Sequence, residues 1–122
     1  MNTKPISPKS HALIDYAMVG SLLVVPYVLG FSKKVKTIYA MEALPLLAYI
    51  ALTDQPASLK PLIPFSVHGK IDPVNMAQFA VQTFFKPFQK DRSARLFNIG
   101  FTVLTGISVL LTDWNGRTKR NA

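Results

Sequence analysis

Two histidine–aspartate pairs have the residue types and the spacing of a metal site. His11 and Asp15 are four residues apart, as are His68 and Asp72. This spacing places two side chains on one face of a helix. Two imidazoles and two carboxylates that meet across a twofold-like axis form a ligand set for zinc or another divalent ion.

The second pair also has a purely structural interpretation. Asp72-Pro73 resembles a helix N-cap followed by proline in the first turn, which would place His68 before the helix. Carboxylates at helix starts are also stabilised by the helix dipole without any ligand. We therefore predict a chain without a cofactor and keep a metal on His11, Asp15, His68 and Asp72 as the lesser alternative.

Glu42 is the other candidate, for a proton or an ion, because it lies inside an apolar segment. An ionisable residue within a membrane helix is costly and usually marks function. Lys36, Arg92 or Arg95 is predicted to extend toward it and form an ion pair near the interface. Phe101 occupies the corresponding position in the second half of the chain, so any role of Glu42 is asymmetric.

Composition limits the classes of function. The chain has no cysteine, so disulfides and thiolate chemistry are excluded. No serine–histidine–aspartate order, glutamate pair or phosphate-binding glycine loop is present, so an enzyme is not expected. Of 122 residues, 49% are hydrophobic and 16% are charged, whereas soluble domains carry about 25% charged residues.

The net charge of +8 comes from short basic clusters between apolar runs. This placement is typical of side chains that meet lipid headgroups beside membrane spans, and not of a nucleic-acid-binding stripe. The predicted partner is therefore a lipid bilayer and not nucleic acid. The residues predicted to contact headgroups are Lys33, Lys34, Lys36, Arg92 and Arg95.

Four apolar segments, residues 12–32, 37–53, 73–85 and 96–114, are predicted to cross the membrane as helices. The third is short and carries Asn75, Gln78 and Gln82 on one face. Such a face suits contact with other helices, with a second copy or with a membrane protein partner, while Phe79, Phe84 and Phe88 are predicted to face lipid. The short segment also leaves a soluble helical bundle as an alternative.

An internal repeat organises these segments. His-x-x-Ile-Asp occurs at residues 11–15 and again at 68–72, and Leu-Thr-Asp occurs at 52–54 and again at 111–113. The predicted divisions are repeat 1 (11–54), a linker (55–67), repeat 2 (68–114) and a basic tail (115–122). Two spans in each half make the repeats parallel, which gathers both histidines and four aspartates at one membrane face.

Residues 25–32, Val-Pro-Tyr-Val-Leu-Gly-Phe-Ser, resemble the Ser-Pro-Trp-x-Leu-Gly-Phe segment of the SPW-repeat bacterial membrane proteins, with Val25 for serine and Tyr27 for tryptophan. Those proteins contain paired two-helix units. The resemblance implies a multi-pass protein of the bacterial inner membrane and no known activity.

The sequence thus predicts an all-α fold, a four-helix transmembrane bundle of two parallel helical hairpins. The expected function is that of a structural or accessory subunit that binds a partner and has no catalytic activity. A small transporter or channel that couples protons or ions through Glu42 is the alternative from a different class.

Overall fold

The computed structural model describes residues 4–121, and these contain five helices and two isolated β-bridges but no strand. The prediction of an all-helical chain is confirmed. The helices are α1 (Pro8–Val28), α2 (Lys33–Ala51), α3 (Phe65–Gln82), α4 (Lys86–Gln89) and α5 (Arg92–Leu111).

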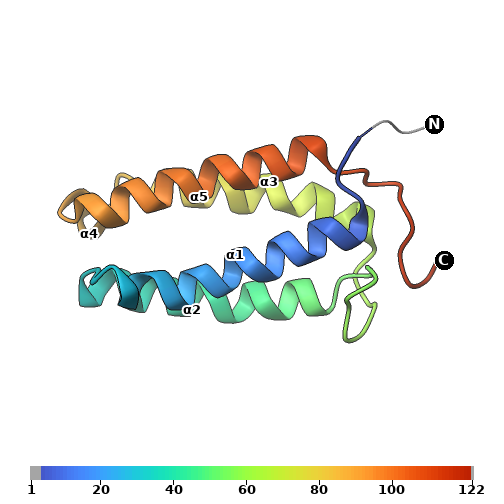
Figure 1. The fold of residues 1–122 in the computed structure, drawn as a ribbon, viewed down its shortest axis with the longest axis horizontal. Helices are drawn as coiled ribbons and strands as arrows, with labels where there is room; N and C mark the ends of the chain where they lie inside the picture. The colour runs from blue at the N-terminus through green and yellow to red at the C-terminus, as the bar shows by residue number, and fades with distance from the viewer. Residues whose placement is uncertain (1–3, 122) are drawn as a thin grey trace.

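The four long helices form two antiparallel pairs, α1 with α2 and α3 with α5 (Figure 1). The connection between α1 and α2 lies at the same end of the molecule as α4, and we call this the turn end. The opposite end, the terminal end, holds the start of α1, the connection between α2 and α3, and the C-terminal segment (Figure 1). Residues far apart in sequence therefore meet at each end.

Side-chain caps begin three of the long helices. Ser7 Oγ accepts a hydrogen bond from the Ser10 amide, and Ser32 Oγ accepts one from the Val35 amide. Asp91 caps α5 through the Ala94 amide and also accepts from the Ser32 amide at 2.9 Å. Each cap satisfies a backbone donor that the helix leaves free, typically worth about 1 kcal/mol. Asp91 also joins the two hairpins at the turn end.

The turn after α1 depends on Gly30, whose φ of +65° lies in the left-handed region that glycine adopts without strain. The Phe31 amide then donates back to the Pro26 carbonyl at 2.8 Å. This is the closure expected where a helix ends on glycine. The chain reverses directly into α2.

The boundaries of the third helix differ from the prediction. Helix α3 begins at Phe65, so residues 65–67 of the predicted linker are helical and Pro73 lies inside the helix. The predicted basic turns are also largely helical, because α2 begins at Lys33 and α4 lies within residues 86–95. Pro64 is the N-cap of this earlier start, with an extended backbone (φ −55°, ψ 142°) before the first helical turn.

The apolar core is rich in aromatic rings near the turn end. Tyr39 and Phe88 are fully buried with ring centroids 5.4 Å apart, and Phe79 packs on Phe101 at 4.7 Å. The prediction that Phe79 and Phe88 face lipid is therefore wrong, while Phe84 is 78% exposed. The short α4 causes the difference for Phe88, because it folds this side chain back between the helix pairs.

Two helices, α1 and α5, are long and apolar enough to cross a membrane. Only 28% and 22% of their most apolar windows are buried inside the molecule, so most of this apolar surface faces outward. Large apolar side chains are also exposed on the other two long helices, including Met41 and Leu44 of α2 and Val74 of α3. Exposed apolar area on this scale marks a surface that meets lipid or another protein.

Candidate metal centre

His11, Asp15, His68 and Asp72 converge at the terminal end. His11 Nε2 lies 3.1 Å from Asp15 Oδ2 and 3.1 Å from Asp72 Oδ2, while His68 Nε2 lies 3.1 Å from Asp15 Oδ2 and 3.1 Å from Asp72 Oδ1. One donor atom from each side chain can be chosen so that all four lie within 4.8 Å of one another. Because α3 starts at Phe65, both pairs are helical and both keep the four-residue spacing. The N-cap interpretation of Asp72 is thus wrong.

Two threonines hold the far side of the imidazole rings. Thr112 Oγ1 lies 2.7 Å from His11 Nδ1, and Thr53 Oγ1 lies 2.7 Å from His68 Nδ1. Each threonine hydroxyl already donates its one hydrogen to the carbonyl four residues earlier, Ser108 or Tyr49. It can therefore only accept from the ring. Both rings must carry a proton on Nδ1, which directs Nε2 toward the two carboxylates.

This arrangement resembles the outer shell of metal-binding histidines, whose second ring nitrogen usually donates to a carboxylate, a backbone carbonyl or water. A partner for the second ring nitrogen fixes the tautomer and the ring orientation, leaving the other nitrogen for the ion. Each histidine is anchored by the threonine of the other half of the chain: His11 by Thr112 and His68 by Thr53. The Leu-Thr-Asp motif therefore matters through its threonine, whereas the repeat in the sequence predicted a shared membrane face for its aspartate.

Aromatic rings shield the site from solvent. The indole of Trp114 lies against His11, with centroids 4.8 Å apart, and the ring of Tyr49 stacks on His68 at 4.1 Å. Tyr49 also donates from its hydroxyl to Asp72 Oδ1 at 2.9 Å. Both histidines are only 1% exposed. The site is buried but every polar atom of the two rings has a partner.

The ionisation of His68 and Asp72, which precede the uncharged stretch of α3, follows from these contacts. Burial by itself lowers the pKa of His68, but hydrogen bonds to Asp15 and Asp72 outweigh it and the pKa is raised. Burial by itself raises the pKa of Asp72, but hydrogen bonds from His11 and His68 outweigh it and the pKa is lowered. With two imidazolium rings and two carboxylates the cluster is neutral. A divalent cation that replaces the two Nε2 protons keeps it neutral.

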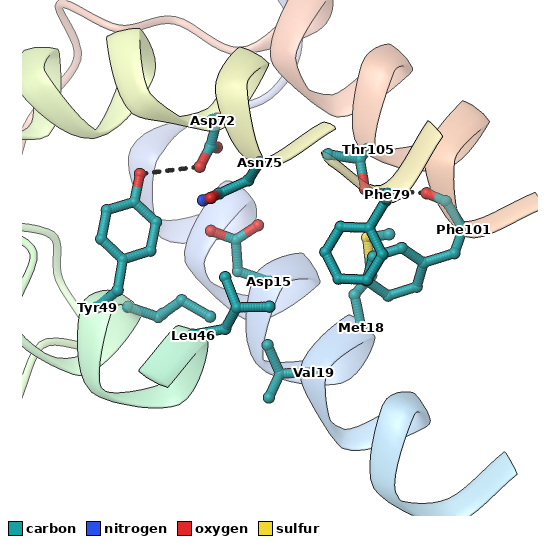
Figure 2. Close-up of a pocket in the computed structure, with 11 residues that line it drawn as sticks. Asp15, Met18, Val19, Leu46, Tyr49, Asp72, Asn75, Phe79, Phe101 and Thr105 are labelled. Atoms are coloured by element: carbon teal, nitrogen blue, oxygen red, sulfur yellow. Dashed lines mark hydrogen bonds between the residues drawn. The ribbon is translucent and has the colours of Figure 1, made fainter. Parts of the chain in front are cut away.

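The dimensions suit a small cation. Ligands about 2.0–2.2 Å from a tetrahedral zinc ion are about 3.3–3.6 Å apart, close to the four 3.1 Å contacts. The carboxylates of Asp15 and Asp72 line a small cavity of about 50 Å³ that continues toward Phe79 and Phe101 (Figure 2). This space admits water next to the carboxylates, since a single water needs about 10–15 Å³ on this measure.

Glu42 lies apart from the metal cluster. Gln78 Nε2 lies 2.5 Å from Glu42 Oε2, and the amide of Gln82 is also adjacent. Among residues 4–121, neither Lys36, Arg92 nor Arg95 is ion-paired with Glu42, so the predicted interfacial ion pair is wrong. The reason is helix rotation, which turns Glu42 toward the amide face of α3.

The five basic residues predicted to contact headgroups all lie at the turn end. Lys36 places Nζ 4.7 Å from the centre of the Tyr27 ring, and Arg95 donates to the Gln89 carbonyl at 2.9 Å. Lys33, Lys34 and Arg92 are exposed.

At the terminal end, Asp54 is buried and accepts a hydrogen bond from the Thr118 hydroxyl at 2.7 Å. This contact holds the basic tail against the rest of the molecule.

Comparison with known proteins adds no relative to this picture. No protein-family model, no curated protein and no solved structure matches the chain. The geometry of the site therefore carries the functional argument by itself.

Proposed function

We propose that this chain is a small integral membrane protein, a non-catalytic accessory subunit of two parallel helical hairpins whose halves are joined at one membrane face by a divalent metal ion. The observation that carries the proposal is the convergence of two Nε2 atoms and two carboxylates, with both Nδ1 atoms held by threonine. Zinc is the probe of choice, since nitrogen and carboxylate donors suit it.

The apolar exterior supports four membrane crossings. A water-soluble bundle buries the apolar stripe of each helix, whereas here all four long helices expose large apolar side chains. Most of the charged residues lie in the connections between the long helices, in the first turns of these helices or in the two terminal segments. A bilayer between the two ends of the molecule accommodates both features and supports a location in a cell membrane. The SPW-repeat resemblance favours the bacterial inner membrane.

Equivalent contacts in the two halves support the repeat. Ile6 forms a β-bridge with Thr112, and Ile63 forms one with Thr53. Helix α1 begins at Pro8 and α3 at Phe65, the offset that also separates His11 from His68. A metal that needs one histidine and one aspartate from each half would hold these halves in one arrangement, which is a structural role for the ion.

Metal analysis of the purified protein tests the proposal. The full chain, purified in detergent with an affinity tag that contains no histidine, is expected to hold about one divalent metal ion per chain by elemental mass spectrometry. The His11→Ala/His68→Ala variant is expected to hold none. Asp54→Asn is the matched control, because Asp54 is a buried carboxylate at the same end outside the cluster.

Adding zinc to the metal-depleted chain gives the second measurement. A ligand that binds only the folded state raises its stability, so the melting temperature of the wild type and of Asp54→Asn should rise by several degrees. That of the double-alanine variant should not change. A wild-type chain that carries no metal and shows no shift with excess zinc would exclude the metal and leave a plain ion-pair cluster.

A transporter or channel is the second candidate, favoured by the asymmetry of Glu42. The groove between α2 and α3 contains Glu42, Asn75 and Gln78, whereas the corresponding groove between α1 and α5 is lined mainly by apolar residues. Proteoliposome flux of protons or divalent cations, compared between wild type and Glu42→Gln, separates this function from that of an accessory subunit.

A further inference from the structure

A chain of hydrogen bonds crosses the molecule beside Glu42, and its direction is set by Asn98. Asn98 of α5 is fully buried, and its Nδ2 donates to the Phe79 carbonyl at 2.8 Å and to Thr83 Oγ1 at 2.7 Å. A backbone carbonyl can only accept, so the atom facing it must be the amide nitrogen. Asn98 Oδ1 therefore points the other way and must accept.

The orientation of the Gln82 amide follows from that of Asn98. Asn98 Oδ1 accepts from the Tyr39 hydroxyl at 2.8 Å, and one end of the Gln82 amide lies 2.8 Å from the same oxygen. Two amide oxygens at this separation would repel each other, so this end is Nε2 and it donates. Gln82 Oε1 is thereby directed at Glu42.

The contact between Gln82 and Glu42 then needs a hydrogen from the carboxyl group. Gln82 Oε1 takes the position 2.6 Å from Glu42 Oε2 and 3.3 Å from Glu42 Oε1. An amide oxygen has no hydrogen to give. We infer that Glu42 is a proton-binding site, a neutral carboxylic acid that carries its proton on Oε2 and donates it to Gln82 Oε1. Gln78 Nε2 donates to the same Oε2, which a hydroxyl oxygen can accept while it donates.

The reversed orientation of Gln82 is the alternative that an ionised Glu42 would need. It turns Nε2 toward the carboxylate but places Gln82 Oε1 2.8 Å from Asn98 Oδ1. Reversing Asn98 as well would set its oxygen against the Phe79 carbonyl. Within the described residues, a neutral Glu42 is the one arrangement that pairs a donor with an acceptor in each contact among Asn98, Gln82 and Glu42.

The surroundings of Glu42 favour the neutral form as well. It lines the groove between α2 and α3 together with apolar side chains such as Met41, Leu46 and Ile71. An isolated carboxylate there would lose its hydration without gaining a counter-ion. The groove opens at the surface of the molecule. This inference is independent of the metal site, which uses other residues at the terminal end.

A carbodiimide tests the site directly. The O–H of a protonated carboxyl group adds across one C=N bond of dicyclohexylcarbodiimide, leaving an acylated urea on the side chain, whereas a carboxylate has no proton to supply. The full chain at neutral pH, in detergent and in phosphatidylcholine vesicles, is expected to be modified at Glu42 by peptide mass spectrometry. Asp54 and Asp91, whose side-chain oxygens accept hydrogen bonds from a hydroxyl and an amide donor, are expected to stay unmodified.

Infrared spectroscopy of the same samples is the second readout. A protonated carboxyl group has a C=O stretching band that a carboxylate lacks, and this band should be present in the wild type and absent from Glu42→Gln. Gln82→Leu removes the acceptor and should shift the band without abolishing it. The inference is overturned if the folded wild type shows no acid band or no modification at Glu42, or if the acid band persists in Glu42→Gln. The wild-type measurements decide even if a variant fails to fold.

Discussion

Single hydroxyl hydrogens determine what the two histidines can do. The hydroxyl groups of Thr53 and Thr112 each donate their one hydrogen to the carbonyl four residues earlier. Both imidazole rings must therefore donate from Nδ1 to these hydroxyl oxygens. Sequence spacing predicted that His11 lies beside Asp15 and His68 beside Asp72, because helical periodicity is local. It missed the threonines, because their contacts join residues on different helices.

Replacing the threonine hydroxyl by a methyl group should weaken metal binding unequally in the two halves. Thr53→Val removes the one described partner of His68 Nδ1, so we expect zinc affinity to fall by about 10- to 100-fold. Thr112→Val should cost less, because Ser108 Oγ also lies 3.1 Å from His11 Nδ1. Competition with a chelating dye measures both affinities.

Thr53→Ser is the matched control for this pair, because it keeps the hydroxyl and should keep wild-type affinity. No loss for Thr53→Val would show that the threonines do not orient the rings. Equal losses for Thr53→Val and Thr112→Val would show that Ser108 does not take the place of Thr112.

At the scale of elements, the start of α3 decides whether the site can form. Pro73 suggested a helix start, yet α3 begins eight residues earlier and continues through it. The missing Pro73 N–H costs one helical hydrogen bond. Tertiary contacts on both sides of Pro73 hold the helix despite this local cost. His68, which precedes Pro73 in α3, contacts Thr53 and Tyr49. Such contacts between distant elements cannot be predicted from the local sequence pattern.

Gly69 sets how closely the C-terminal segment packs on α3. A Cβ at Gly69 would lie 2.6 Å from Cδ2 of Trp114, too close for any side chain. Gly69→Ala should therefore displace the indole from the histidines and shift its fluorescence emission to the red. Trp114 is the only tryptophan of the chain, so the signal is unambiguous.

Gly20→Ala provides the comparison for this experiment, because nothing lies within 4 Å of a Cβ at Gly20. Its emission spectrum should match that of the wild type. An unshifted spectrum for Gly69→Ala would show that the indole does not pack against α3 at this point.

Asn98 joins α2, α3 and α5 in the centre of the molecule. Asn98→Leu would leave the Tyr39 hydroxyl, the Phe79 carbonyl and Gln82 Nε2 without this partner. A buried polar group without a partner costs about 1–3 kcal/mol, so we expect a loss of at least about 2 kcal/mol. Denaturation followed by circular dichroism in detergent measures it. Asn75→Leu, a partly exposed change on α3, should cost far less.

At the scale of the whole molecule, the two hairpins are joined at three levels. Asp91 accepts from Ser32 at the turn end, Asn98 accepts from Tyr39 in the middle, and the histidine–aspartate cluster closes the terminal end. The sequence repeat predicted which residues share an end, because an even number of helices in each half returns the chain to its starting side. It did not predict the central contacts, since the helix rotations that bring Tyr39, Gln82 and Asn98 together arise only from packing.

The number of membrane crossings can be measured because the chain contains no cysteine of its own. Single cysteines at Ser10, Lys34, Leu59 and Gln89, all exposed, can be labelled by a membrane-impermeant maleimide from one side of sealed vesicles. With four crossings, Lys34→Cys and Gln89→Cys report one side, while Ser10→Cys and Leu59→Cys report the other. If only α1 and α5 cross, Leu59→Cys shares the side of Lys34→Cys, because α2 then does not return the chain. Leu59 therefore distinguishes the two topologies, and it is 85% exposed in the connection between α2 and α3. Only the four-crossing topology leaves both histidines at the same membrane face, with one bilayer thickness between them and the basic turns.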